Sequence, residues 1–198
     1  MTSENDRKPV WVYHWLVWTV VLIVMDQTSK ALIRTNLLPG SRLLLIGEIL
    51  SITYTPNYRG VSWFVPDLPA WILSLILILR LLVMLMAFPV YDFYSRYCRA
   101  SSWALLTSIL ISAGIVGNLL DGAFTPYTTD FIQVFQSPTA NFADLFSMAG
   151  LCTLSIEFGL QWKHIKSNWR GVRHFLAQQI QVMNAFINHL KMYFVRKA

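Results

Sequence analysis

Charged residues are scarce in this chain of 198 residues, because they make up 13% where soluble domains carry about 25%. Cysteine is scarcer still: Cys98 and Cys152 alone are too few and too badly placed for a disulfide framework or a zinc site. The sequence also lacks Cys and His at metal-ligand spacing and a glycine-rich phosphate loop. These absences argue against a soluble domain, redox chemistry and a metal or nucleotide site, so we expect no metal and no cofactor.

Hydrophobic residues are abundant, at 55% of the chain, and the mean hydropathy of the chain is +0.47. The formal net charge is +6, but several of the basic residues flank apolar runs. Lys and Arg in such places determine membrane topology. The composition therefore indicates an integral membrane protein that binds membrane lipid and no nucleic acid.

Four apolar runs are near the length of about 20 residues that a helix needs to cross a bilayer. We expect an all-α membrane protein with four transmembrane helices. The membrane domain is expected over residues 11–162, with a cytoplasmic N-terminus at 1–10 and a cytoplasmic tail at 163–198. The predicted spans are residues 11–33, 70–88, 103–120 and 142–162.

The distribution of basic residues predicts the orientation. The tail beyond Trp162 has seven Lys and Arg and no acid, whereas no Lys or Arg occurs between Arg99 and Lys163. Because basic loops stay in the cytoplasm, both termini should be cytoplasmic and the connection between the last two spans should lie outside. The first span should remain uncleaved, since Asp26 and Lys30 stand where a signal-peptide cleavage site would need small residues.

Two segments outside the spans have recognisable patterns. The first connection, residues 34–68, has short β-rich runs at 43–46 and 49–54, which predict a small extracytoplasmic hairpin or sheet on the outer membrane surface. The basic tail is amphipathic in places. We interpret it as a helix lying along an anionic leaflet, in preference to a partner-binding segment.

Polar residues recur on one face of the third predicted span. Gly114, Gly117, Asn118 and Asp121 follow the spacing i, i+3, i+4, i+7, so they form one stripe. The glycines permit close approach of another helix, and the two polar residues lie near the outer end. Asn118 as a helix-packing contact and Asp121 as a helix cap are the structural alternatives.

Further polar residues are predicted at the same membrane depth. Asn141 and Asp144 share a face at the outer end of the fourth span, and Asp26 and Lys30, four residues apart, are able to pair at the outer end of the first. Asp130 lies in a short segment that returns from the outer loop. The structural alternative for Asp26 and Lys30 is an orienting ion pair. The alternative for Asp144 is a first-turn acid at a helix N-terminus. Two carboxylates facing each other there would suit general acid and general base chemistry.

The sequence resembles the lipoprotein signal peptidase family, signal peptidase II, of bacteria. The family's patterns are D-Q-x-x-K, N-x-G-(A/V)-(A/S)-F, G-N-L-I-D-R, V-D-F-I and N-x-A-D. The similar segments here are Asp26-Gln27-Thr28-Ser29-Lys30, Asn57-Tyr58-Arg59-Gly60-Val61-Ser62-Trp63-Phe64, Gly117-Asn118-Leu119-Leu120-Asp121, Thr129-Asp130-Phe131-Ile132 and Asn141-Phe142-Ala143-Asp144.

The resemblance implies an aspartic endopeptidase of the bacterial cytoplasmic membrane, with Asp130 and Asp144 as the catalytic pair near the outer face. It implies as substrate a prolipoprotein whose cysteine carries diacylglycerol, cut just before that cysteine. The residues implied to support the site or bind substrate are Asp26, Lys30, Asn57, Gly60, Asn118, Asp121 and Asn141.

Two departures from the family patterns keep an alternative open. The second motif has an extra residue before Gly60 and an inserted Trp63, and Gly122 stands where the family has Arg. Arg59 is a candidate replacement for that Arg. The alternative is a catalytically silent homologue that serves as a membrane-complex subunit or a lipoprotein-binding protein. A small ion transporter is a third class, but its acids would lie near the middle of the membrane.

Two charges lie away from the predicted site. Arg80 and Glu157 are expected at similar depths in the second and fourth spans, where we expect them to pair, with independent contacts as the alternative.

Overall fold

The computed structural model describes residues 10–58, 69–97 and 100–167, together with Ala177 and Ile180. Among these residues, four helices are long and apolar enough to cross a membrane. Their outer surfaces are apolar: Leu79 and Leu85 on the second helix are 57% and 64% exposed, as side chains that face lipid would be. The predicted four-helix membrane fold is confirmed, with helices α1 (Val10–Asn36), α2 (Ala70–Tyr97), α3 (Ser102–Phe124) and α4 (Phe142–Ser167).

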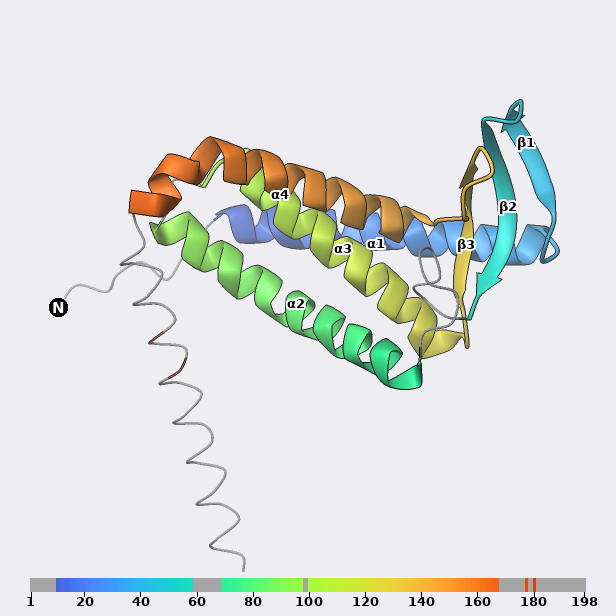
Figure 1. The fold of residues 1–198 in the computed structure, drawn as a ribbon, viewed down its shortest axis with the longest axis horizontal. Coiled ribbons are helices and arrows are strands. Elements are labelled where there is room, and N and C mark those ends of the chain that lie inside the picture. Colours follow the sequence, from blue (N-terminus) through green and yellow to red (C-terminus); the bar gives the residue numbers. More distant parts are fainter. Residues whose placement is uncertain (1–9, 59–68, 98–99, 168–176, 178–179, 181–198) are drawn as a thin grey trace, which may run out of the picture.

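Helix α3 is the centre of the bundle, since it contacts each of the other three helices. Figure 1 shows it between α2 and α4. Its close packing on α4 depends on glycines. A Cβ atom on Gly114 would lie 2.9 Å from the backbone nitrogen of Ser147, and one on Gly150 would lie 2.7 Å from Cγ1 of Ile111. A larger residue at either position would therefore push the two helices apart.

A small antiparallel sheet stands across one end of the bundle (Figure 1). The predicted hairpin is formed by β1 (Arg42–Ile46) and β2 (Leu50–Asn57), with Gly47 in the turn at φ +48. A third strand, β3 (Thr128–Val134), comes from the connection between α3 and α4 and pairs with β2. The sheet thus joins two loops that are distant in the sequence.

The sheet is held against the end of α1 by a small apolar core of Ile33, Tyr54 and Phe131. One residue comes from α1, one from β2 and one from β3. In the β2–β3 register, Thr55 lies opposite Asp130 and Asn57 lies opposite Thr128. The core and the register together fix Asp130 at the junction between the sheet and the helices.

Candidate active site

Asp130 lies within β3 and is almost completely buried, with 2% of its surface exposed. The side-chain amide of Asn57, at the end of β2, donates to Oδ2 of Asp130 at 2.9 Å. The side-chain amide of Asn141 donates to Oδ1 at 2.6 Å. Each oxygen of this carboxyl group therefore accepts a hydrogen bond from an asparagine on a different element.

Asp144 lies in the first turn of α4, where it and Asn141 cap the helix reciprocally. The backbone N–H of Asp144 donates to Oδ1 of Asn141 at 3.0 Å, and the backbone N–H of Asn141 donates to Oδ2 of Asp144 at 3.2 Å. This is a capping box, and the positive end of the helix dipole favours a negative charge on Asp144. Asp144 can therefore be both a first-turn acid that caps the helix and a residue of the site.

Two asparagines connect the two carboxyl groups. Asn118 on α3 donates from Nδ2 to Oδ1 of Asp144 at 2.9 Å and accepts at Oδ1 from Nδ2 of Asn141 at 3.1 Å. Asn141 also donates to both acids, through its side chain to Asp130 and through its backbone to Asp144. The predicted residues Asn57, Asn118, Asp130, Asn141 and Asp144 therefore form one continuous hydrogen-bonded network.

The environment of Asp130 favours its protonated form. Burial raises the pKa of Asp130 to about 7, and the negative charge of Asp144 adds to the increase. The hydrogen bonds from Asn57 and Asn141 act in the opposite direction and lower this pKa. Burial therefore outweighs the two hydrogen bonds, and Asp130 keeps a proton more readily than an ordinary carboxyl group does.

A second cluster of charges beside this network is centred on Lys30. Its Nζ lies 2.7 Å from Oδ2 of Asp26 and 3.0 Å from Oδ2 of Asp121, and all three side chains are at most 1% exposed. Lys30 also donates to Oδ1 of Asn118 at 3.3 Å. The predicted pairing of Asp26 with Lys30 is thus present, but Lys30 binds a second acid from α3 as well.

Asp121 positions the strand that bears Asp130. Its Oδ2 accepts from the backbone N–H of Thr129, the residue before Asp130, at 3.1 Å. Arg34 donates to Oγ1 of Thr129 at 2.9 Å and lies 3.6 Å from Oδ1 of Asp121, so the cluster contains two acids and two bases. Arg34 was not predicted as part of the site, although its place four residues after Lys30 puts both on one helix face.

Asp26 connects α1 to the N-terminus of α4. Its Oδ1 accepts from the backbone N–H of Ala143 at 2.9 Å. Gly117 makes this contact possible, since a Cβ atom there would lie 2.8 Å from Oδ2 of Asp26 and 2.9 Å from Cβ of Ala143. The glycine in the predicted stripe therefore allows three helices to meet directly behind the two carboxyl groups.

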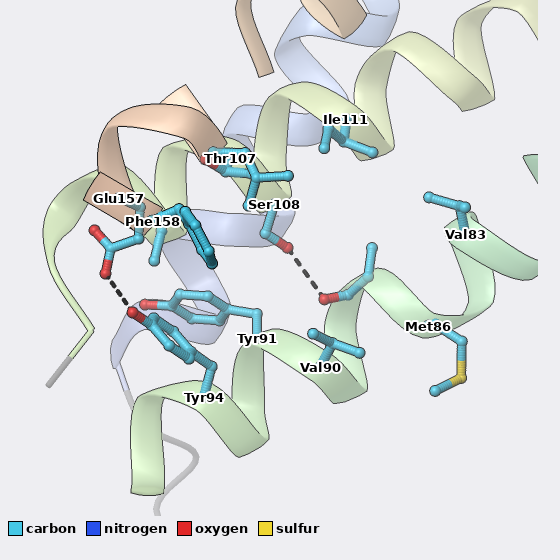
Figure 2. A pocket seen from close by; sticks show the side chains of 13 residues that line it. Val83, Met86, Val90, Tyr91, Tyr94, Thr107, Ser108, Ile111, Glu157 and Phe158 are labelled. Carbon is cyan, nitrogen blue, oxygen red and sulfur yellow. Dashed lines mark hydrogen bonds between the residues drawn. The ribbon is translucent and has the colours of Figure 1, made fainter. Parts of the chain in front are cut away.

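The expected pair of Arg80 and Glu157 is wrong. Among the described residues, Glu157 accepts from the hydroxyl group of Tyr94 at 2.7 Å and from both the backbone N–H and the hydroxyl group of Ser101. Figure 2 shows Glu157 beside Tyr94 in an apolar cavity of about 340 Å³ formed by α2, α3 and α4. Arg80 lines a different cavity, because depth along a helix does not determine which way a side chain faces.

That second cavity, of about 510 Å³, adjoins the asparagine network. Asn57 and Asn118 line it, and so do Arg80 and Gly122. Two residues predicted from the sequence to belong here, Gly60 and Arg59, lie outside the described residues.

Comparison with known proteins identifies the family. The family model described as signal peptidase (SPase) II matches residues 18–160. A lipoprotein signal peptidase of Syntrophomonas wolfei subsp. wolfei is 30% identical over 149 residues, which cover 75% of this chain and 95% of the relative. A lipoprotein signal peptidase of Leifsonia xyli subsp. xyli is 28% identical over 167 residues, covering 79% of this chain and 73% of the relative.

Solved structures agree on the fold. Two bacterial membrane enzymes match with TM-scores of 0.66 and 0.60 at 21% and 20% identity, covering 81% and 77% of this chain and 96% of each enzyme chain. At that identity the likeness bears on the fold alone. The family model matches residues 18–160, which include most of the four helices. This multi-pass membrane protein therefore belongs to the signal peptidase II family.

Proposed function

We propose that the protein is a membrane aspartic endopeptidase that removes the signal peptide from diacylglyceryl-modified prolipoproteins just before the lipidated cysteine. Asp130 and Asp144 are its catalytic pair. The observation that carries the proposal is that Asn141 donates a hydrogen bond to each of these two carboxyl groups. The family membership and the names of the relatives support the reaction class and the substrate class.

The environments of the two acids suggest how they divide the chemistry. Asp130 is buried and its pKa of about 7 keeps a proton available, which suits a general acid. Asp144 is only half-buried and caps the N-terminus of α4, where negative charge is favoured, which suits a general base. Environments that separate two carboxyl groups in this way are common at sites of acid–base catalysis.

In the first step Asp144 takes a proton from a water molecule, and the water oxygen attacks the carbonyl carbon of the scissile peptide bond. Asp130 gives its proton to the carbonyl oxygen, so the intermediate is a neutral gem-diol. Asp144 now carries the proton and Asp130 the charge. The bond between Asn118 and Asp144 holds the base in place for this step.

In the second step the C–N bond breaks, and Asp144 delivers its proton to the departing nitrogen. One hydroxyl group of the gem-diol returns its proton to Asp130, which leaves a carboxylic acid on the signal peptide and an amine on the lipidated cysteine. Both acids then have their starting protonation. The supporting cluster of Lys30, Asp26 and Asp121 takes no proton in either step.

The proposed site lies near the outer face of the bacterial cytoplasmic membrane, and both termini are cytoplasmic. The carboxyl groups lie at the sheet end of the bundle, and the basic tail follows the opposite end of α4. Since diacylglycerol anchors in the outer leaflet, the scissile bond is presented at the same depth.

A labelling experiment tests this orientation. A cysteine introduced at exposed Gln136, after Cys98 and Cys152 are replaced, should react with a membrane-impermeant maleimide added outside intact cells. Labelling only after permeabilisation would reverse the orientation.

The experiment that tests the reaction is incubation of the purified full chain with a diacylated prolipoprotein, followed by mass spectrometry of both products. We expect a free signal peptide and a lipoprotein that begins with the lipidated cysteine. Cleavage at another bond would refute the proposed specificity.

A silent homologue is the second candidate, favoured by one observation: Gly122 lacks the arginine side chain that the family motif has. On that alternative the chain binds lipoproteins, or serves in a membrane complex, without cutting. Binding of the diacylated substrate with no product, by a folded protein in the same assay, would support it over the peptidase.

A further inference from the structure

The second cavity contains a charge that the proposed mechanism does not use. Arg80 is the tenth residue of the candidate span Trp71–Ser95, and a charge within a span is costly unless it faces protein or a polar cavity. Among the described residues that line the cavity, Arg80 alone is charged.

The geometry of α2 directs Arg80 to this cavity. Leu73, Ile76, Leu77 and Arg80 all line it, and their spacing of i, i+3, i+4, i+7 places them on one face of the helix. Asn118 on α3, which donates to Asp144 at 2.9 Å, also lines this cavity. Arg80 thus shares a cavity with a residue that is hydrogen-bonded to Asp144.

The two other basic residues described near the site, Lys30 and Arg34, do not line this cavity. Lys30 binds Asp26 and Asp121 while fully buried, and Arg34 binds Thr129 and lies beside Asp121. Gly122 lines the cavity and a Cβ atom there would meet nothing within 4 Å, so space lies beside α3 where the family motif has an arginine.

We propose that Arg80 is a substrate-binding residue, which donates to backbone carbonyl oxygens at the C-terminal end of the bound signal segment. The proposal rests on the peptidase function proposed above, and it assigns Arg80 as the positively charged residue of the substrate cavity. The last four carbonyl groups of a helix have no partner within the helix, and they form the negative end of its dipole. A guanidinium group offers five N–H donors and stays charged.

The position of Arg80 also relates to the missing arginine. Arg80 on α2 and position 122 on α3 line the same cavity from two walls. A side chain at position 122 would therefore start from the same cavity that Arg80 lines, with no atom within 4 Å of its Cβ. This predicts that the charge can be moved from α2 to α3 with recovery of substrate binding, which no purely structural role of Arg80 would allow.

The test compares Arg80→Gln, Gly122→Arg and the double variant in the full chain, with Leu79→Gln as the matched control. Leu79 is the adjacent α2 residue, 57% exposed and absent from the described cavity lining. Arg80→Gln should raise KM by about ten- to hundredfold, because the loss of a hydrogen bond to a charged group weakens binding by about that factor. The change in kcat should be smaller. The double variant should recover at least about tenfold of that loss.

Two results would overturn the proposal: an Arg80→Gln KM within about twofold of that of Leu79→Gln, or a folded double variant no better than Arg80→Gln. A substrate with ether-linked in place of ester-linked lipid chains tests which carbonyl is bound. The penalty of Arg80→Gln should persist with it, and loss of the penalty would refute binding to the peptide.

Failure of this proposal is distinguishable from failure of the peptidase proposal. Binding of a fluorescent diacylated lipobox peptide, in the same detergent, needs no cleavage. If the wild-type chain binds the peptide but does not cut it, and Arg80→Gln weakens binding about tenfold or more, the peptidase proposal fails and the role of Arg80 stands. Equal binding by both chains refutes the role of Arg80.

Discussion

At the scale of single residues, burial and the charge of Asp144 outweigh the two asparagine hydrogen bonds in setting the pKa of Asp130. Asn57 and Asn141 both donate to Asp130 and lower its pKa, against burial and the charge of Asp144, which raise it. The result is a pKa of about 7 for a carboxyl group whose ordinary value is 3.8. An acid that keeps its proton near neutral pH can donate it during peptide hydrolysis.

The first prediction is that cleavage slows as pH rises through about 7, because Asp130 loses the proton that it donates. Removing the Asn57 donor by Asn57→Ala should raise the pKa of Asp130, so the alkaline limb of the kcat/KM profile should move to higher pH. Thr55→Ala is the control, since the Thr55 hydroxyl group contacts the Thr53 carbonyl and not Asp130. A limb that stays in place or moves to lower pH in Asn57→Ala would contradict the assignment.

The second prediction concerns Lys30, which is fully buried between Asp26 and Asp121. Lys30→Met leaves two buried carboxyl groups without their shared partner and should lower the free energy of unfolding by about 3–5 kcal/mol. The measurement is unfolding in mixed micelles by titration with SDS. Exposed Thr35 on the same helix supplies the control Thr35→Ala, expected within about 0.5 kcal/mol of wild type. Equal stability of the two variants would show that the cluster has no structural role.

At the scale of elements, the site depends on where one strand and one helix begin. β3 brings Asp130 beside Asn57 through its register with β2, and α4 begins at Phe142 so that Asn141 and Asp144 cap each other. Asp121 on α3 accepts a hydrogen bond from the backbone N–H of Thr129, the residue before Asp130. Asp26 on α1 accepts one from the backbone N–H of Ala143, the residue before Asp144. The buried charges therefore fix the backbone on which each acid stands.

The sequence was sufficient to predict the four spans, the β1–β2 hairpin and the grouping of acids at one end of the helices, because hydropathy and helical spacing are local properties. It did not predict the pairing of β3 with β2 or the second acid on Lys30, since both are contacts between distant segments. The pairing of Arg80 with Glu157 failed for a related reason. Residue counting gives depth along α2 and α4 but not the rotation of each helix about its axis.

The third prediction tests the close approach of α1, α3 and α4 at Gly117. Gly117→Ala places a Cβ atom 2.8 Å from Oδ2 of Asp26 and 2.9 Å from Cβ of Ala143, so it should destabilise the fold by about 1–3 kcal/mol and slow cleavage. Gly159→Ala in α4 is the matched control, because its Cβ atom would meet nothing within 4 Å. A Gly117→Ala protein as stable and active as Gly159→Ala would mean that the helices are not in contact as described.

At the scale of the whole molecule, an apolar bundle supports a polar network at one end. The sheet rests on α1 through Ile33, Tyr54 and Phe131, and the carboxyl groups lie where the sheet meets the helices. The proposed function requires such a position, because its substrate is anchored in lipid and its peptide bond has to meet polar groups. The basic tail bears on the proposed function only through the orientation in the membrane that its charge predicts.

The most direct test of the central claim is the rate of cleavage of a diacylated prolipoprotein by Asp130→Asn and Asp144→Asn, each compared with the wild-type chain at equal folded concentration. An amide can replace neither a general acid nor a general base, so each variant should lose at least about hundredfold in rate while still binding the diacylated lipobox peptide. A variant of either kind that keeps more than about a tenth of the wild-type rate would contradict the assignment of Asp130 and Asp144 as the catalytic pair.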